Sequence, residues 1–233
     1  MLSEPIDTRQ FMDVVRGPLT SGDAAALAHA VKARWTARQV CRLLRHEDAD
    51  VRRVAAVTIG MVGERSLAPC LARSLHDADP MVNEMAEHGL WSIWFRCGSS
   101  EASKPFSEGV QHLSDERYEP AVHCFNAATA LDPQFAEAFN QCAIAHFFLG
   151  QWRPAVADCR RALALMPIHF GAMAGMGHCH TQLGEMEQAL RCYRAAVRIN
   201  PRLTAVAAAI PRLEAMLADE RDSSGIYDAA QIR

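Results

Sequence analysis

Small, bulky and proline residues recur along the middle of this chain with a spacing of 34 residues, without gaps from residue 102 to residue 203. The columns are Ala121, Ala155, Ala189, then Phe125, Cys159, Tyr193, then Ala128, Ala162, Ala196, with Pro133, Pro167 and Pro201 at the end of each period. Small side chains let two helices approach closely, bulky ones fill the space between neighbours, and proline ends a helix. The pattern predicts three helix pairs, over residues 102–135, 136–169 and 170–203.

The first helix of each predicted pair and the turn after it carry further repeated positions. The small positions are Gly109, Ala143 and Gly177, and the turns are Leu149-Gly150 and Leu183-Gly184. With these columns, residues 102–203 resemble the tetratricopeptide repeat (TPR) family, although the first unit has Ser114-Asp115 at its turn and is the weakest match there. The resemblance implies an all-α fold, a right-handed α-solenoid of stacked antiparallel helix pairs. Its first helices would line a concave groove that holds an extended peptide or a partner helix.

A different repeat, with a shift of 31 residues, precedes this array. Residues 44–55 align with residues 75–86, and each copy places an aspartate, Asp48 or Asp79, before an apolar helix. Because such an aspartate caps a helix, the pattern resembles the HEAT repeat. Residues 1–97 are expected to form HEAT-like helical repeats, with helices near 8–16, 23–34, 36–46, 49–62, 65–76 and 80–96. Asn83 replaces Arg52 in the second copy, which argues against an Asp-Arg ladder between units.

Three aromatic residues, Trp91, Trp94 and Phe95, share one face of the helix expected at 80–96. Large apolar groups are usually buried, so these residues are expected to form the seam between the two arrays. Only Gly98-Ser99-Ser100 separates the arrays, which favours stacking over free movement. The alternative interpretation is a partner-binding patch.

An Ala-rich segment at residues 204–219 follows the third unit. Its apolar positions have helical spacing and are Ile210, Leu213, Met216 and Leu217. It is expected to be a capping helix that covers the exposed flank of the array, with Pro211 either kinking it or starting a new helix. Residues 220–233 are polar and are expected to form a flexible tail.

Composition narrows the function classes. Half of the 233 residues are hydrophobic and the formal net charge is −3, so no nucleic-acid partner is expected. No apolar run approaches the ~20 residues that cross a bilayer, and no basic stretch leads into an apolar run at the start, so no membrane association and a cytoplasmic location are expected. The eight cysteines form no Cys-x-x-Cys pair and are expected to be small apolar fillers.

Catalytic and metal-binding patterns are weak. We find no nucleophile elbow, phosphate loop, dinucleotide fingerprint or paired carboxylates, so the protein is expected not to be an enzyme and to need no cofactor. His112, His146 and His180 occupy the same position of the three units. Because stacked helix pairs lie ~8–10 Å apart, these histidines cannot bind one ion together. We expect them to be packed and hydrogen-bonded to a carbonyl or to water. Cys142 and His146 stand one helical turn apart, but His178 should face the other way, so no metal site is expected.

The groove is the predicted working surface. Inward positions of each first helix are the second, fifth, ninth and twelfth of the unit, and Glu137 is the one charged residue among them. The predicted binding residues are Phe106, Val110, Leu113, Asn140, Ile144, Phe147, Ala174, His178 and Thr181. Asn140 is expected to hold a peptide backbone through its amide. Apart from Asn140, the set has almost none of the Lys, Asn and Arg residues with which members of the resembling family clamp a chaperone's C-terminal carboxylate. An apolar or amphipathic peptide or helix is therefore the expected ligand.

These observations favour a non-enzymatic scaffold or adaptor that binds another protein. One alternative is that the groove is filled by the chain's own tail or by a second copy. Another is an accessory or regulatory subunit whose array serves mainly to self-assemble, which would make the protein a homo-oligomer. A further alternative is an enzyme on a HEAT scaffold. It would use Trp91, Trp94, Arg42, Arg45, Arg52 and Arg53.

Overall fold

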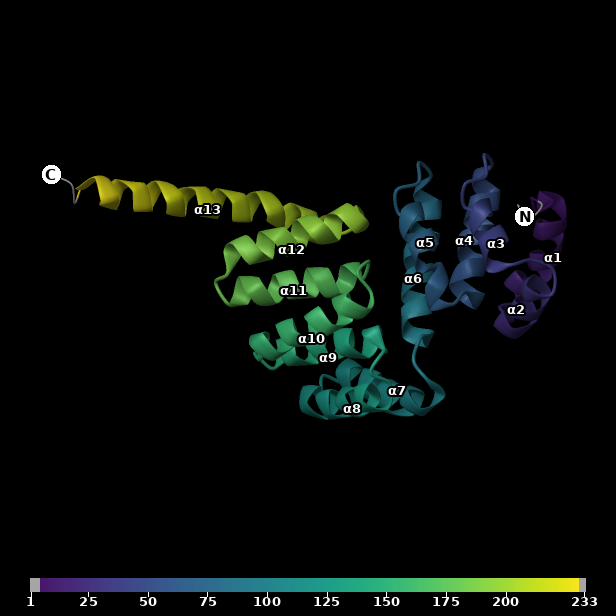
Figure 1. The fold of residues 1–233 in the computed structure, drawn as a ribbon, viewed down its shortest axis with the longest axis horizontal. Helices are drawn as coiled ribbons and strands as arrows, with labels where there is room; N and C mark the ends of the chain where they lie inside the picture. Colours follow the sequence, from purple (N-terminus) through teal and green to yellow (C-terminus); the bar gives the residue numbers. More distant parts are fainter. Residues whose placement is uncertain (1–4, 231–233) are drawn as a thin grey trace. The chain divides into compact units, whose positions relative to one another are not determined.

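The computed structural model describes the backbone of residues 5–230 and the side chains up to residue 219, and every regular element in that part is helical. The predicted all-α class is confirmed. The chain divides after Cys97 into two compact units, which are described separately below. Figure 1 labels the helices in chain order.

The N-terminal unit contains six α-helices and one short 3-10 turn. They are α1 (Thr8–Ser21), α2 (Ala24–Lys32), α3 (Ala37–Leu43), α4 (Ala49–Val62), the turn Arg65–Leu67, α5 (Ala68–Ser74) and α6 (Pro80–Arg96). Helix α1 continues beyond the expected end at residue 16 and stops at Gly22, whose φ of 69° suits glycine. Asp48 and Asp79 cap α4 and α6 by accepting backbone N–H groups, as the sequence predicts. The assignment of this unit to HEAT repeats stays a prediction.

Arginine and aspartate side chains do connect the two aligned copies, contrary to the expectation drawn from Asn83. Arg52 donates from Nε and Nη2 to the carboxylate of Asp77, with both distances 2.9 Å. Arg53 forms a second paired contact, with Asp79. Asn83 instead donates to the carbonyl oxygen of Asp77 at 2.9 Å. The arginines of the first copy therefore reach the turn before α6, which lies within the second copy, and the second copy needs no arginine for this link.

Cys41 and Cys70 form a disulfide that joins α3 to α5, with their Cα atoms 6.1 Å apart. This corrects the expectation that all eight cysteines are free apolar fillers. Four of the other cysteines, Cys142, Cys159, Cys179 and Cys192, are free and buried. Spacing along the chain could not identify the pair because the two cysteines are 29 residues apart on separate helices.

The aromatic residues of α6 do not share one environment. Trp94 is 1 % exposed and belongs to the core of the N-terminal unit. The ring of Trp91 meets that of Trp94 edge to face, with centroids 5.1 Å apart, whereas Phe95 is 38 % exposed. The seam predicted for the three residues stays a prediction, and Trp94 is explained by packing within its own unit.

The C-terminal unit contains the helix pairs that the repeated columns predict. They are α7 (Ser100–Ser114) with α8 (Tyr118–Leu131), α9 (Ala136–Phe148) with α10 (Trp152–Leu165), and α11 (Phe170–Gln182) with α12 (Met186–Ile199), followed by α13 (Thr204–Ala230). Each helix packs on the next in a continuous stack (Figure 1). The first helices of neighbouring pairs, α7, α9 and α11, also contact one another.

Small and bulky positions are matched within each pair. A Cβ atom added to Gly109 would lie 2.7 Å from the ring of Phe125, and one added to Gly177 would collide with the ring of Tyr193. In the second pair Cys159 replaces the aromatic residue, and Ala143 replaces the glycine. Both belong to the same buried cluster. Glycine is therefore used where the opposing helix carries an aromatic ring.

The turn of the first pair is strained where the other two are not. Gly150 and Gly184 adopt φ angles of 71° and 74°. At the equivalent position the first pair has Glu116, with a φ of 57°. Residues with a Cβ disfavour this left-handed conformation by roughly 1–2 kcal/mol.

Helix α13 caps the array, but it is longer than predicted. It runs from Thr204 through Pro211 to Ala230 without interruption, so residues 220–230 are helical and the expected flexible tail is wrong for them. Residues 231–233 lie outside the described part. Val206, Leu213 and Leu217 pack on the cluster around Tyr193, whereas Met216 is 47 % exposed. Helix propensity does not account for residues 220–230, because Asp222, Ser223, Ser224 and Gly225 are poor helix formers. Among the described helices, we find none with the length and apolar character to cross a membrane.

Candidate partner-binding site in the second repeat

Groove residues predicted in the first unit belong to its core. Phe106 is 6 % exposed, and its ring lies 4.5 Å from that of Phe135 and 5.9 Å from that of Phe125, centroid to centroid. Val110 and Leu113 are partly buried against the same cluster. Phe106 therefore cannot serve as an exposed anchor, which corrects the expectation from spacing. Helical spacing identified the correct face but not the rings that cover it.

Asn140 is also buried, with an exposed fraction of 2 %. Its Nδ2 donates to Oε1 of Glu137 at 3.0 Å, and Nε2 of Gln141 donates to the same oxygen at 2.6 Å. The amide is thus engaged within the protein, and the expected role of holding a peptide backbone does not fit this arrangement.

Glu137 was expected in the groove but forms the centre of a buried polar network. Its Oε2 lies 2.7 Å from Nε2 of His169, and both side chains have no exposed area. The backbone N–H of Ala172 donates to Nδ1 of His169 at 3.1 Å, so Nδ1 is the acceptor and Nε2–H donates to Glu137. The network ties α9 to the N-terminus of α11. It could not be identified from the sequence because its two main members are 32 residues apart.

Four of the predicted groove residues line one apolar pocket, namely Asn140, Ile144, Phe147 and His178. The pocket has a volume of about 200 Å³ and lies where α9, α10 and α11 meet. Its remaining lining residues are Ala143, Phe148, Cys159, Gly175 and Cys179. Ala174 is 8 % exposed and packs in the third unit, and Thr181 donates to the carbonyl oxygen of Gly177 at 3.0 Å, so neither lines the pocket.

The pocket exists because the second unit lacks an aromatic ring at its bulky position. Phe125 and Tyr193 fill this position in the first and third units, and both are buried. Cys159 takes the same place in the second unit and lines the pocket together with Ala143. A thiol is much smaller than a phenyl ring, so space remains between the helices.

Aromatic groups form the rim of the pocket. His178 Nδ1 lies 2.7 Å from the hydroxyl oxygen of Tyr193, which fixes the imidazole, and the His178 ring centroid is 6.4 Å from that of Phe147. Desolvation lowers the pKa of His178 below its ordinary value, which favours the neutral ring. Phe148 is 57 % exposed and stacks on Tyr118 with ring centroids 5.0 Å apart. The rim is therefore aromatic and uncharged.

The repeated histidines differ in their partners. His146 Nδ1 lies 2.7 Å from the side-chain carbonyl oxygen of Gln151. His180 Nδ1 lies 2.6 Å from a carboxylate oxygen of Glu185, rather than from the carbonyl or water that was expected. His112 Nδ1 is buried and has no hydrogen-bond partner.

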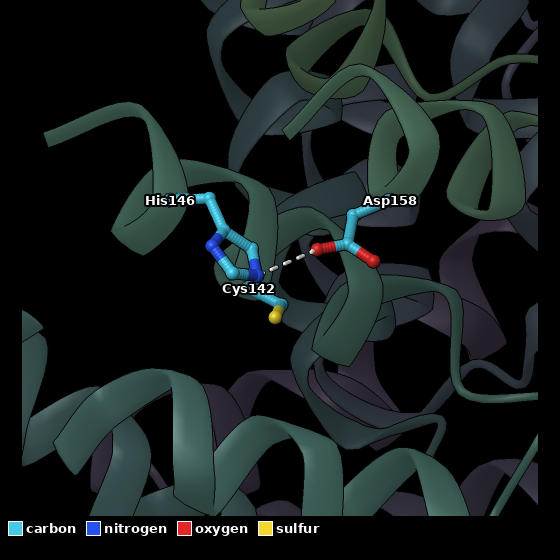
Figure 2. Close-up of side chains that lie close together, drawn as sticks. All are labelled: Cys142, His146 and Asp158. Atoms are coloured by element: carbon cyan, nitrogen blue, oxygen red, sulfur yellow. Dashed lines mark ion pairs between the residues drawn. The ribbon is translucent and has the colours of Figure 1, made fainter. Parts of the chain in front are cut away.

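Asp158 of α10 brings a third polar group to Cys142 and His146 of α9 (Figure 2). His146 Nε2 lies 3.6 Å from Asp158 Oδ2. Burial raises the pKa of the Cys142 thiol and that of the Asp158 carboxyl. The sequence pattern does not point to Asp158, because it lies on the following helix, 16 residues beyond Cys142.

Comparisons with known proteins agree with this architecture. The tetratricopeptide repeat family matches residues 172–203. A TPR repeat-containing protein of Rhizobium etli is 27 % identical over 108 residues, which are 46 % of this chain and 53 % of that protein. RNA polymerase II-associated protein 3 of Mus musculus is 26 % identical over 128 residues, 55 % of this chain and 19 % of that protein. The chain therefore spans about half of the first relative and less of the second.

Solved structures show the same fold. The first TPR domain of Spaghetti (RPAP3), bound to the HSP90 peptide SRMEEVD, has a TM-score of 0.51 at 22 % identity, covering 52 % of this chain and 95 % of that one. The Sgt2 TPR domain of Aspergillus fumigatus has a TM-score of 0.50 at 17 % identity, covering 54 % of this chain and 84 % of that one. Residues 172–203 therefore match the tetratricopeptide repeat family, and the unit that begins at Gly98 is similar in fold to solved arrays of such repeats.

Proposed function

We propose that the C-terminal unit is a non-enzymatic protein-interaction module. It binds a peptide or helix of a partner protein by taking up one large apolar side chain in the pocket of the second repeat. The observation that carries this proposal is the pocket lined by Ile144, Phe147 and Cys159, which the replacement of an aromatic residue by cysteine leaves open.

The size and chemistry of the pocket support an apolar ligand group. Its volume of about 200 Å³ exceeds the roughly 150 Å³ of an apolar cavity that takes up benzene. Neither Lys nor Arg is among its lining residues. A side chain such as Leu, Met or Phe would therefore be buried there without leaving a polar group unpaired.

The charge of the groove favours an apolar over an acidic ligand. The peptide in the solved Spaghetti complex, SRMEEVD, ends in acidic residues. Helices α9 and α11 of this chain contain neither Lys nor Arg, and α7 contains Lys104 alone. A groove with so few cations has little to offer a carboxylate, so the ligand inferred here differs from that peptide.

The test is a selection of binding peptides from a random phage-displayed library on the full chain, followed by measurement of Kd by fluorescence anisotropy. We expect the selected peptides to share one large apolar residue. The double substitution Ala143→Gly with Cys159→Phe copies the first unit and fills the pocket. Burial of one large apolar side chain contributes about 1.5–3 kcal/mol, so filling the pocket should weaken binding about 10- to 100-fold.

Ala164→Glu, on the exposed side of α10, is the matched control and should leave Kd unchanged. Far-UV circular dichroism of both variants establishes that they are folded. Equal affinity of the filled variant and the native chain contradicts the proposal. A native dimer that dissociates in the filled variant, observed by sedimentation, would also contradict it, because a second copy would then occupy the pocket.

A further inference from the structure

The side chains of Cys142, His146 and Asp158 converge between the two helices of the second repeat (Figure 2). One potential ligand atom from each residue lies within 4.8 Å of the other two. Cys142 and His146 are one helical turn apart on α9 and therefore share a face, which α10 completes with Asp158. Ligand atoms around one tetrahedral zinc ion lie about 3–4 Å apart, so the His146–Asp158 separation of 3.6 Å already fits.

The orientation of His146 leaves its second nitrogen available. Nδ1 lies 2.7 Å from Oε1 of Gln151, so Nδ1–H donates to that carbonyl and Nε2 carries the lone pair. Nε2 is the nitrogen that faces Asp158. Metal-binding histidines usually donate their other N–H in this way, which fixes both tautomer and ring position.

The group is enclosed but not sealed. Cys142 is 1 % exposed, whereas the side chains of His146 and Asp158 are 15 % and 20 % exposed. An ion could therefore enter past the imidazole and the carboxylate, and solvent could reach one side of it. The thiol forms the inner wall of the site.

The other two repeats show that this group is not a by-product of the repeat. The equivalent residues are Glu108, His112 and Cys124 in the first unit, and Met176, His180 and Cys192 in the third. The third unit orients its histidine through Glu185 but has methionine in place of a thiolate or carboxylate. The first unit has a carboxylate, Glu108, and a thiol, Cys124, at the two equivalent positions. It has Arg117 at the position of Gln151, however, and Nδ1 of His112 has no hydrogen-bond partner. Of these three fully described units, the second alone combines a thiol, a carboxylate and an imidazole whose Nδ1 is held by a hydrogen bond.

We propose that Cys142, His146 and Asp158 bind one zinc ion through three protein ligands, leaving a fourth position open to water or a partner's side chain. A thiolate, an imidazole and a carboxylate together suit zinc better than the oxygen-seeking magnesium or calcium. Binding converts the Cys142 thiol to a thiolate bonded to zinc and releases its proton to solvent. The site does not depend on the apolar pocket or on its proposed ligand.

Cobalt(II) titration of the full chain tests the proposal, because a cobalt-thiolate bond gives a charge-transfer absorption in the near ultraviolet. We expect one equivalent to bind with this band and with the visible absorption of a tetrahedral ion, and zinc to displace it. Cys142→Ala should abolish the charge-transfer band. Asp158→Asn keeps the shape of the side chain and should weaken cobalt binding at least 10-fold, and Gln151→Leu should weaken it about 10- to 100-fold.

Two controls separate this site from other thiols. Cys179→Ala removes a buried cysteine from the next repeat, and the Cys41→Ser, Cys70→Ser double variant removes the disulfide pair. Both should bind cobalt like the native chain. Absence of the charge-transfer band in the native chain, or its persistence at equal affinity in both Cys142→Ala and Asp158→Asn, would overturn the proposal. Zinc should also raise the unfolding temperature of the native chain more than that of Asp158→Asn.

Discussion

Cys159 lines the apolar pocket together with Ala143, at the two repeat positions where the first unit sets Phe125 against Gly109 and the third sets Tyr193 against Gly177. The first and third units thus pair an aromatic ring with a glycine. The second unit has at these two positions a side chain smaller than the ring and one larger than glycine. This leaves an opening that two aromatic-glycine pairs close elsewhere in the array. The site arises from a departure from the repeat rather than from an added element.

The pairing predicts that the two positions are energetically coupled. Cys159→Phe alone should destabilise the C-terminal unit by about 1–3 kcal/mol, because the ring meets the methyl group of Ala143. Adding Ala143→Gly removes that methyl group, so the two substitutions should show a favourable coupling of about 0.5–3 kcal/mol. Denaturant unfolding of the two single variants and the double variant measures the cycle. Simple additivity would show that the two positions do not share the space.

The turn at Glu116 can be stabilised by a substitution that relieves its backbone strain. Glu116→Gly gives the first unit the residue that the other two use at a positive φ. We expect a stabilisation of about 1 kcal/mol, because glycine adopts the left-handed conformation without a steric penalty. Hydrogen exchange at α7 and α8 measures the local free energy of opening. Gly150→Glu is the reverse substitution and should destabilise its turn by a similar amount.

The free energy of unfolding of the N-terminal unit should fall at low pH because Asp79 becomes protonated. A hydrogen bond from Arg53 lowers the pKa of Asp79 to about 2. Since the ordinary pKa is about 3.9, this stabilisation is fully present above about pH 4 and is lost as the pH falls through about 2.

Asp79→Asn keeps the helix cap of Met81 and Val82 but removes the charge. The variant should therefore be less stable than the native chain at neutral pH, and the difference should vanish below about pH 2. Unfolding is followed by tryptophan fluorescence in a Trp152→Phe background, so that the signal comes from this unit, which contains Trp35, Trp91 and Trp94. A difference that persists at low pH would mean that the cap, not the charge, is affected.

The buried network around Glu137 should be costly to break. Glu137→Ala leaves the donors of Asn140, Gln141 and His169 without their acceptor, and each unsatisfied buried donor costs about 1–3 kcal/mol. We expect a loss of roughly 3 kcal/mol or more in the unfolding free energy, measured by denaturant. Glu119→Ala, at an exposed position of α8, is the control and should change it little.

The disulfide between Cys41 and Cys70 should be measurable in two ways. Thiol titration of the unreduced, unfolded chain should find six reactive thiols, since two of the eight cysteines form the disulfide. Reduction should destabilise the N-terminal unit by about 2–4 kcal/mol. Cys97→Ser should have no comparable effect, and eight reactive thiols in the unreduced chain would contradict the bond.

Positions of helices were predictable because their signals are local. Apolar spacing, capping aspartates and turn glycines act within a few residues, so the sequence alone determined the helix pairs of residues 102–203 and most helices before them. The matched columns also predicted which positions are small and which are bulky. The helix over residues 220–230 could not be predicted from local signals, because the segment is polar and Asp222, Ser223, Ser224 and Gly225 are poor helix formers.

Surfaces and sites were decided only by the tertiary structure. Spacing assigned Phe106 and Asn140 to the groove, but rings from other helices cover the first and Glu137 engages the second. The pocket, the Glu137–His169 pair and the Cys142–His146–Asp158 group each join side chains of different helices, 16 or 32 residues apart in the chain. Whether such residues meet depends on the distance and rotation at which two helices pack. These are set by all the side chains between the helices together, and no single stretch of sequence contains that information.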